Sequence, residues 1–486
     1  MIKYTTLSFF LGFVVFIGVV GLRPKPNTPP NIVLIFADDM GYGDITCFGG
    51  LETQTPNLDK MAVEGIRFTN FLVAQAVCSA SRTALLSGCY PNRVGIVGAL
   101  MPTATIGINT KEELLPELLK AKGYATGIFG KWHLGHHKEF LPLQHGFDEY
   151  YGLPYSNDMW PVGFDGKPAL DGFKKSYPVL PLIEGNEKVS EVKTPTDQDK
   201  LTTVYTERAV SFIERHKKQP FFLYVPHSMP HIPLGVSDKF RGKCKQGLYG
   251  DMLMEFDWSV GQILKSLKDN GLDKNTLVIF TSDNGPWLNF GNHAGSTGGL
   301  REGKGTTFEG GHRVPCIVRW PSVVPAGLVC DKLTTTMDIL PTVAKLCGAE
   351  LPKQKIDGVD IIELLKGSPT ATPRKYFYYY YNRNSLEAVR RDNWKLVLDH
   401  PQSQGYTDML PKNDGFPGSF YKGQVLQALY DLRRDGGERY DVQKLYPEIV
   451  IELQKIAEEA RTDLGDDVTN RTGANVREGG KIEVKK

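Results

Sequence analysis

Four short apolar runs constrain the fold of this chain more than any other feature of its sequence. They are rich in β-branched and aromatic residues and do not alternate with polar ones, a pattern typical of strands buried on both faces. Segments with helical periodicity lie between them, for example 110–123 and 250–270. This alternation predicts an α/β fold with a large mixed, mostly parallel sheet sandwiched by helices. The runs are residues 31–37, 125–129, 221–225 and 276–281.

Polar residues directly follow each of these runs. In α/β sheets of this kind, ligands bind beyond the carboxyl ends of the strands, so we expect these residues to share one pocket. Each cluster alone would also fit an ordinary turn, because Asp, Asn and Gly favour turns. Four strand ends that all carry an acid, a base or an amide favour the pocket. The residues are Asp38 and Asp39, then Lys131 and His133, then His231, then Asp283 and Asn284.

Three of these side chains are carboxylates, and Asn284 adds an amide oxygen. Crowded carboxylates repel one another unless a cation lies between them. Ligands that are all oxygen suit a hard ion, Ca²⁺ or Mg²⁺, rather than zinc, which favours His and Cys. Arg82, Lys131 and Lys304 add positive charge, which suits a substrate with a compact anionic group. For each single base, the alternative is a solvated surface side chain or a structural histidine.

The first residues of the chain have the pattern of an export signal. A basic Lys3 precedes an apolar run that ends at residue 22, and a Pro-rich linker, 23–30, follows. This order predicts a signal peptide over 1–22 and a secreted, periplasmic or lumenal protein, with an uncleaved membrane anchor as the alternative. The formal net charge is +2 and no long Lys/Arg run appears, so we expect no nucleic-acid partner. The seven cysteines leave disulfide pairing open.

The pattern changes near residue 371, which predicts a catalytic domain over 31–370 and a smaller α+β subdomain over 371–464. Residues 447–464 have the apolar spacing of an amphipathic helix that would cover a short antiparallel sheet. Residues 465–486 form a polar tail that we expect to be loose. The expected strands of the small sheet are 375–381, 387–391, 394–398 and 428–432.

Cys78 stands at the head of a short helical run and is followed by Ala80, Arg82 and Gly88. The segment resembles the modification signature of the type I sulfatases, Cys-x-(Pro/Ala)-x-Arg followed by Leu-x-Gly, whose cysteine is oxidised to formylglycine (3-oxoalanine). A small buried or reactive cysteine is the alternative. Because further segments resemble the family in the same order, the chain is identified as a member of the type I sulfatases, in the alkaline phosphatase superfamily, similar to arylsulfatase A and N-acetylgalactosamine-6-sulfatase. These segments are 31–44, 55–59, 130–135, 146–158, 282–285, 301–307 and 429–438.

The resemblance implies an alkaline-phosphatase-like fold and a hydrated aldehyde at position 78 as the nucleophile for sulfate ester hydrolysis. Arg82 would steady this hydrate, and His133 would take a proton from its second hydroxyl to release sulfate. Either His231 or Lys304 would protonate the leaving oxygen, and His231 is preferred to His227 because His-x-Pro is the local pattern of the family. The implied Ca²⁺ ligands are Asp38, Asp39, Asp283, Asn284 and residue 78. The implied sulfate-binding residues are Lys131, Ser156, His231 and Lys304.

Ala80 departs from the proline that is commonest in the signature. The family tolerates alanine there, so a formylglycine-generating enzyme and a radical-type maturating enzyme both stay open as the maturation partner. Two other functions also stay open, namely a phosphonate monoester or phosphodiester hydrolase of the same superfamily and a non-catalytic binder of sulfated glycans. Asn284, in place of the histidine of two-zinc members, favours a single hard cation.

The variable loops around the pocket give no direct substrate signal. An exported enzyme meets sulfated polysaccharides, so we expect a sulfated carbohydrate substrate rather than a small aryl sulfate. Trp160 or the tyrosines of 375–381 are hypothesised to line a sugar subsite, with packing as the alternative for the tyrosines. His136 and His137 are hypothesised to touch a sugar, with a solvated loop as the alternative.

Overall fold

The computed structural model describes residues 29–51, 53–406, 409 and 411–482. The expected signal peptide, 1–22, and most of the linker, 23–30, lie outside the described residues. Within the described part of the chain, no helix is both long and apolar enough to cross a membrane.

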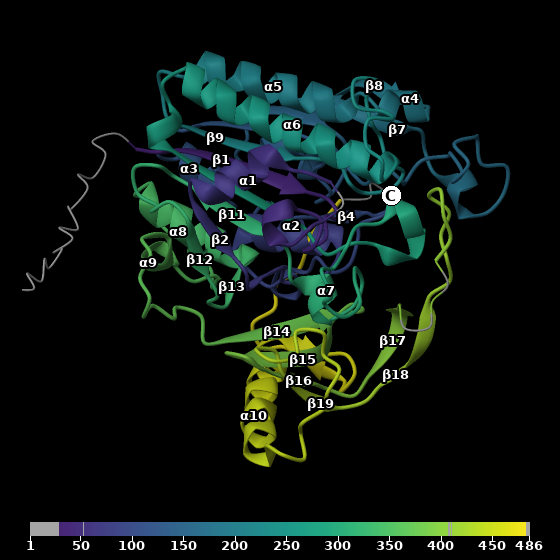
Figure 1. Cartoon of the computed structure of the whole chain (residues 1–486), viewed down its shortest axis with the longest axis vertical. Coiled ribbons are helices and arrows are strands. Elements are labelled where there is room, and N and C mark those ends of the chain that lie inside the picture. The colour runs from purple at the N-terminus through teal and green to yellow at the C-terminus, as the bar shows by residue number, and fades with distance from the viewer. Residues whose placement is uncertain (1–28, 52, 407–408, 410, 483–486) are drawn as a thin grey trace, which may run out of the picture.

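A ten-stranded sheet forms the centre of the larger part of the molecule (Figure 1). The four predicted strands lie side by side in its middle and are parallel, in the order β10, β1, β9, β5. Antiparallel pairings occur towards both edges, so the sheet is mixed but parallel at its centre. In order, the strands are β12 (Leu328–Cys330), β2 (Ile66–Phe68), β11 (Cys316–Arg319), β10 (Thr276–Ser282), β1 (Asn31–Ala37), β9 (Phe221–Pro226), β5 (Ala125–Phe129), β6 (Glu149–Gly152), β7 (Leu180–Glu184) and β8 (Glu187–Val192).

Helices cover both faces of this sheet because its central strands are apolar on both sides. Side chains of β1 alternate between two separate cores: Ile32 and Leu34 belong to one, and Val33 and Ile35 to the other. The first core is covered by α2 (Cys78–Ser87), α3 (Leu115–Lys120), α8 (Ile339–Leu346) and α9 (Ile362–Leu365). The second is covered by α1 (Pro56–Val63), α5 (Leu201–His216) and α6 (Leu248–Asp269). The predicted fold class is therefore confirmed.

Helix α3 is shorter than the helix expected over 110–123. Pro116 lies in the first turn of α3, where its missing N–H costs nothing, and Glu117 closes a bond to the backbone N–H of Leu114 at 2.7 Å. Residues 110–111 form a turn instead, and 112–114 are outside any helix. A proline inside an apolar periodic stretch thus marks the helix start, which periodicity alone places too early.

The C-terminal subdomain is a four-stranded antiparallel sheet with one helix packed on it (Figure 1). The helix α10 (Pro447–Leu464) has the predicted bounds and buries Leu453, Ala457, Ala460 and Leu464 against the sheet. The strand order is β14 (Tyr376–Tyr381), β15 (Ser385–Arg391), β16 (Trp394–Val397) and β19 (Ala428–Asp431).

The tail after Gly465 is paired rather than loose over its described residues. β20 (Gly465–Asp466) pairs with β21 (Arg471–Thr472), and β22 (Gly480–Lys481) pairs with β4 (Ile106–Gly107) of the larger part. The guanidinium of Arg93 donates to the backbone oxygen of Asn475 at 2.9 Å. The expectation of a loose tail was wrong because backbone pairing, which composition does not reveal, ties these polar residues down.

A long hairpin leaves the small subdomain and lies along the larger part (Figure 1). It consists of β17 (His400–Gly405) and β18 (Tyr421–Val425). Beyond β17 its connection contacts the segment after β10: the N–H of Gly418 donates to the backbone oxygen of Asn289 at 2.7 Å. Besides short 3-10 turns, the remaining described elements are the strand pair β3 (Phe71–Leu72) and β13 (Thr334–Thr335), with the short helices α4 (Pro195–Gln198) and α7 (Glu309–His312).

The core that α2 covers contains a buried histidine whose ring nitrogens are left without hydrogen bonds among the described residues. His145 is fully buried beside Trp132, and neither ring nitrogen has a hydrogen-bond partner among the described residues. Burial lowers the pKa of its imidazole from 6.5 to about 4. Below pH 6.5 the imidazole therefore binds a proton in the unfolded chain but not in the folded one, and stability falls as the pH drops towards 4.

We expect His145→Leu, which is close in volume and has no polar atom, to stabilise the protein by about 1 kcal/mol at pH 8. At pH 5 the gain should be larger. The wild-type protein must then keep the ring deprotonated at a pH where the unfolded chain would protonate it, and the variant has no such cost. Denaturant midpoints of both proteins at the two pH values measure this. Equal or lower stability of the variant at pH 5 would contradict the assignment.

Candidate active site

The predicted polar clusters meet at the carboxyl ends of the central strands. Asp38 and Asp39 follow β1, Lys131 and His133 follow β5, and all are buried. Strands β1 and β10 pair in register up to Ala37 and Ser282, so Asp283 lies directly beside Asp38 and Asp39. The N–H of Asp39 donates to Oδ1 of Asp283 at 3.0 Å, which ties the two strand ends together.

Cys78 is the first residue of α2 and points into this cluster. Its Sγ lies 3.7 Å from Oδ1 of Asp38 and 3.3 Å from Nζ of Lys304. Burial raises the pKa of the thiol to about 12, more than the neighbouring lysines lower it. An unmodified Cys78 would therefore be a neutral thiol at neutral pH, and only the thiolate is a strong nucleophile.

Cationic side chains hold the carboxylates in fixed positions. Arg82 bridges the strand ends, since one of its nitrogens lies 2.9 Å from Oδ2 of Asp283 and 3.4 Å from Oδ2 of Asp38. Lys131 Nζ donates to Asp38 at 2.5 Å. Burial alone would raise the pKa of Asp38, but Lys131 and Arg82 hold that pKa well below its usual value. Burial and the Asp38 charge raise the pKa of Asp283, so this carboxylate needs more positive charge than the side chains supply.

The donor set fits a hard cation. The Oδ1 atom of Asn284 is buried without a hydrogen-bond partner, whereas the amide nitrogen donates to Oδ1 of Asp39 at 2.7 Å. Ligand atoms of Asp38, Asp39, Cys78 and His231 lie within 4.8 Å of one another. An orphaned amide oxygen beside three carboxylates is what Ca²⁺ or Mg²⁺ would satisfy.

The residues expected to bind an anion line one side of this cluster. Nζ of Lys131 donates to Oγ of Ser156 at 3.1 Å, and that oxygen lies 3.4 Å from Nε2 of His231. Nζ of Lys304 donates to both carboxylate oxygens of Asp39, at 2.7 and 2.9 Å. Burial would lower the pKa of Lys304, but the negative groups around it, Asp39 foremost, together keep that pKa well above its usual value, so this lysine stays charged. The group can thus surround a small anion with donors.

His133 has a left-handed backbone (φ 63°) and a buried ring. Its Nε2 contacts the backbone oxygen of Leu100 at 2.9 Å, and its Nδ1 has no hydrogen-bond partner. Burial and then Lys131 lower the pKa of the imidazole well below 6.5. His133 is therefore neutral at neutral pH and retains a nitrogen without a partner, as a proton acceptor requires.

Trp287 is a neighbour of the cluster that the sequence did not reveal. The Nζ atom of Lys304 lies 4.4 Å from the centre of its ring, and the ring of His231 lies 5.5 Å away. A tryptophan three residues after Asn284 carries no motif of its own. Its position shortly after the end of a strand was the sequence signal that could have pointed to it.

Other candidate residues are not brought into the cluster. His227 contacts Ser259 through Nε2 at 3.2 Å and packs on Phe256, so the structure brings His231 and not His227 to Asp39. Trp160 is only 1% exposed and its ring packs among the apolar side chains of the core on the α5–α6 side, so neither face of the ring is open to a sugar in this structure.

Two tyrosines of the expected strand pack inside the protein, and the two loop histidines lie against each other. Tyr379 and Tyr380 are fully buried, which excludes their rings from a sugar subsite. His136 and His137 pack on each other, with ring centres 4.3 Å apart. His137 also contacts the backbone oxygen of Ala104 at 3.2 Å.

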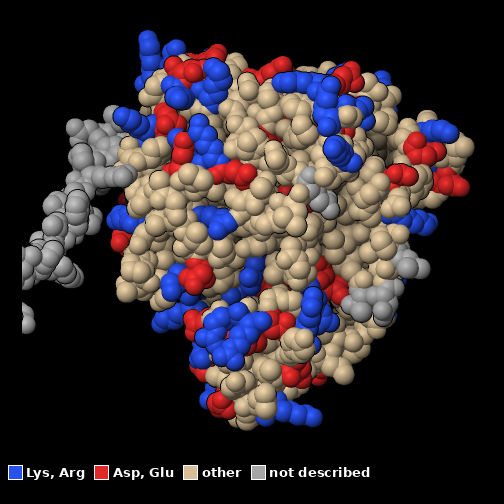
Figure 2. Space-filling model, in the orientation of Figure 1, with Lys and Arg blue, Asp and Glu red and all other residues tan. Residues whose placement is uncertain are grey.

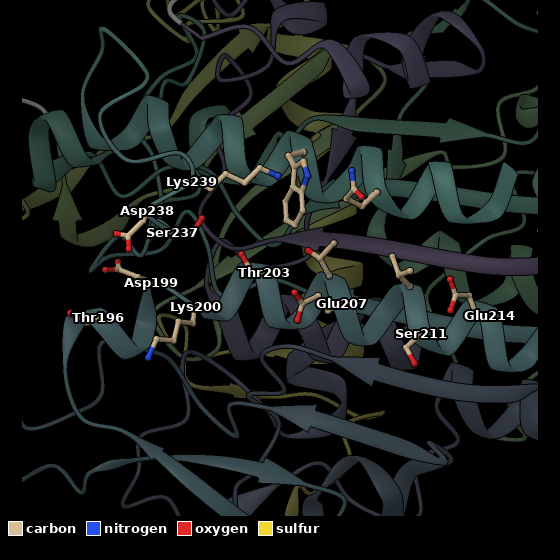
Figure 3. Close-up of a pocket in the computed structure, with 14 residues that line it drawn as sticks. Thr196, Asp199, Lys200, Thr203, Glu207, Ser211, Glu214, Ser237, Asp238 and Lys239 are labelled. Atoms are coloured by element: carbon tan, nitrogen blue, oxygen red, sulfur yellow. The ribbon is translucent and has the colours of Figure 1, made fainter. Parts of the chain in front are cut away.

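A large cavity lies away from this cluster. It measures about 770 Å³ and lies between α5 and α6, where Trp258, Lys239 and Glu207 are among its lining residues (Figure 3). None of the candidate catalytic residues lines it. Basic and acidic side chains are intermixed on the face seen in Figure 2, which fits the small net charge of +2.

The larger part of the chain and its small subdomain each match a family description. The sulfatase family matches residues 30–349, and the C-terminal region of aryl-sulfatase matches residues 372–479. N-acetylgalactosamine-6-sulfatase of Mus musculus is 39% identical over 440 residues, covering 85% of this chain and 82% of that protein. Arylsulfatase A of Homo sapiens is 38% identical over 427 residues, covering 85% of this chain and 83% of that protein.

A solved structure shares the architecture. The PsFucS1 sulfatase from Pseudoalteromonas sp. superposes with a TM-score of 0.80 at 27% identity, covering 89% of each chain. The chain therefore belongs to the type I sulfatases of the alkaline phosphatase superfamily, and it is a sulfuric ester hydrolase.

Proposed function

We propose that this enzyme removes sulfate from sulfated carbohydrates, with formylglycine at position 78 as nucleophile and one Ca²⁺. The observation that carries the proposal is the place of Cys78, at the start of α2 and 3.7 Å from a carboxylate of the cluster. Relatives that act on a sulfated sugar, as the name N-acetylgalactosamine-6-sulfatase states, support the substrate class.

The proposed modification would replace the thiol, which is a poor nucleophile, with a more suitable group. A thiol with a pKa of about 12 is a poor nucleophile, and a sulfate ester formed on a simple side chain would need water to turn over. As a hydrated aldehyde, residue 78 would supply one hydroxyl for attack on sulfur and a second whose deprotonation releases sulfate. Nδ1 of His133, buried and without a partner, would accept that proton.

The remaining residues would bind and orient the substrate. Lys131, Ser156, His231 and Lys304 would surround the sulfate oxygens, and His231 or Lys304 would give the leaving oxygen its proton. Arg82 would hold the nucleophile against the strand ends. A bound Ca²⁺ would be held by Asp38, Asp39, Asp283, Asn284 and residue 78, and it would supply charge neutralisation beside the sulfate.

Export and maturation belong to the same proposal. The signal-like start of the chain supports a secreted, periplasmic or lumenal enzyme. A formylglycine-generating or radical-type maturating enzyme would act on Cys78 before α2 is buried, because the thiol is 2% exposed in the folded protein. The proposed division is a catalytic domain over 31–370 and a subdomain over 371–464.

Removal of divalent cations tests the metal. We expect a chelator to abolish hydrolysis of an aryl sulfate, because the Asp cluster would lose its counter-charge. Added Ca²⁺ should restore more activity than Mg²⁺, and elemental analysis should find one Ca²⁺ per chain. Full activity in a metal-free preparation would contradict the proposal.

A desulfation screen with matured enzyme tests the function itself. The substrates are sulfated oligosaccharides, an aryl sulfate and a phosphonate monoester. We expect the greatest kcat/KM for the release of sulfate from one of the oligosaccharides. Turnover of the phosphonate alone would favour the phosphonate hydrolase, and glycan binding without turnover of any ester would favour the non-catalytic binder.

A further inference from the structure

One wall of the proposed site comes from the C-terminal subdomain. The hairpin β17–β18 contacts the loop that carries Lys304. A Cβ atom added to Gly305 would meet Oε1 of Gln404 at 2.2 Å, so hairpin and loop are in direct contact. The hydroxyl of Tyr381, from β14, donates to the same Gln404 oxygen at 3.2 Å. Two segments of the small subdomain therefore meet beside Lys304.

Tyr406, directly after β17, makes two hydrogen bonds to this loop. Its hydroxyl donates to the backbone oxygen of Lys304 at 2.6 Å, and its backbone N–H donates to Oε2 of Glu302 at 2.5 Å. The N–H of Lys304 donates in the opposite direction, to the backbone oxygen of Pro286 at 3.0 Å. The residue is thus held on one side by the catalytic part and on the other by Tyr406.

The loop needs such restraint because its own conformational preferences are weak. Glu302 has a left-handed backbone (φ 60°), which costs a non-glycine residue roughly 1 kcal/mol or more. Gly303 and Gly305 flank Lys304, and Gly305 also has a positive φ of 83°. Glycines on both sides leave many backbone conformations open to Lys304. Contacts from outside the loop must select one.

The conformation that is selected places the ammonium group of Lys304 at the centre of the cluster. Its Nζ lies 2.7 Å from Asp39, 3.3 Å from Sγ of Cys78 and 4.4 Å from the centre of the Trp287 ring. In the function proposed above, this ammonium binds sulfate and stands beside the leaving oxygen. A displacement of about 1 Å in such a group costs about a hundredfold in rate.

We propose that Tyr406 is a positioning residue that fixes Lys304, so that the C-terminal subdomain completes the catalytic centre. This inference rests on the proposed sulfatase mechanism. The tyrosine hydroxyl acts through the backbone of Lys304 and does not itself touch the substrate. The small subdomain is then part of the catalytic unit.

Tyr406→Phe removes only the hydroxyl that reaches Lys304. We expect kcat/KM for an aryl sulfate to fall about tenfold, mainly through kcat, because one hydrogen bond that holds a transition-state contact is lost. The matched control is Tyr421→Phe, at an exposed tyrosine of the same hairpin, which should retain wild-type kinetics. Formylglycine content, measured by mass spectrometry, should be equal in all the proteins.

The decisive comparison repeats Tyr406→Phe in a Lys304→Ala background. If Tyr406 acts through the lysine side chain, the second substitution should change the residual rate less than twofold. A full tenfold loss in both backgrounds would show a general structural role and would overturn the inference. Wild-type kcat/KM in Tyr406→Phe would overturn it as well. Neither result would touch the proposed function, which fails only if the matured wild-type protein hydrolyses no sulfate ester.

Discussion

Replacing Cys78 with alanine is expected to abolish sulfate ester hydrolysis, with a loss in kcat of about four orders of magnitude or more. The substitution removes the thiol group that the proposed modification converts to an aldehyde, and it leaves Lys131, Lys304 and the carboxylates in place. Cys78 is 2% exposed and small, so alanine should preserve α2. Rates with an aryl sulfate and the thermal midpoint measure the two effects separately.

Cys89 provides the matched control, since it is a second buried cysteine just after α2 and outside the signature. Cys89→Ala should retain the wild-type rate within a factor of about two, because the Cys89 thiol contacts Lys355 and Arg477 and none of the proposed catalytic residues. Substantial activity in Cys78→Ala would show that another group attacks sulfur. Equal losses in both variants would show that the helix, rather than the nucleophile, had been damaged.

Lys395→Met is expected to destabilise the protein by about 3–5 kcal/mol. The Nζ atom of Lys395 is fully buried at the contact between the two parts, 2.7 Å from Glu438 and 3.3 Å from Glu309. It also donates to the backbone oxygen of Thr307 at 2.7 Å. Methionine fills the space but leaves Glu438 with an uncompensated buried charge. The shift in the denaturant midpoint measures the effect.

A double substitution separates charge from packing at this contact. Glu438→Gln added to Lys395→Met removes the unpaired carboxylate, and we expect it to recover part of the lost stability. A double variant that is less stable than Lys395→Met alone would show that the carboxylate is held mainly by other partners. It would then contradict the assignment of Lys395 as the principal counter-charge.

The central sheet was predictable because burial on both faces leaves a strong mark on sequence. The strands β1 and β5 begin and end where the apolar runs do, and polar residues mark their carboxyl ends. The same marks located the cluster, since parallel strands bring their ends to one edge. Asp39 and Asn284 therefore lie within hydrogen-bond distance although 245 positions of the sequence separate them.

Contacts made by the backbone and by loops leave no comparable pattern in the sequence. The pairing of β22 with β4 uses glycine and lysine positions that composition marks as a loose tail. Tyr406 reaches Lys304 only because the hairpin β17–β18 folds back across the other part. A tryptophan gives no sequence sign of whether its ring faces a ligand or the core, and Trp160 faces the core. Such features depend on tertiary placement rather than on local pattern.

The chemical state of residue 78 tests the central claim most directly. The measurement is the mass of the tryptic peptide that contains position 78, taken from active enzyme and compared with the same peptide from Cys78→Ala. The account predicts the mass of an aldehyde or its hydrate in place of the thiol, in a fraction that tracks the specific activity across preparations. Full specific activity in protein whose peptide carries only the intact thiol would contradict it.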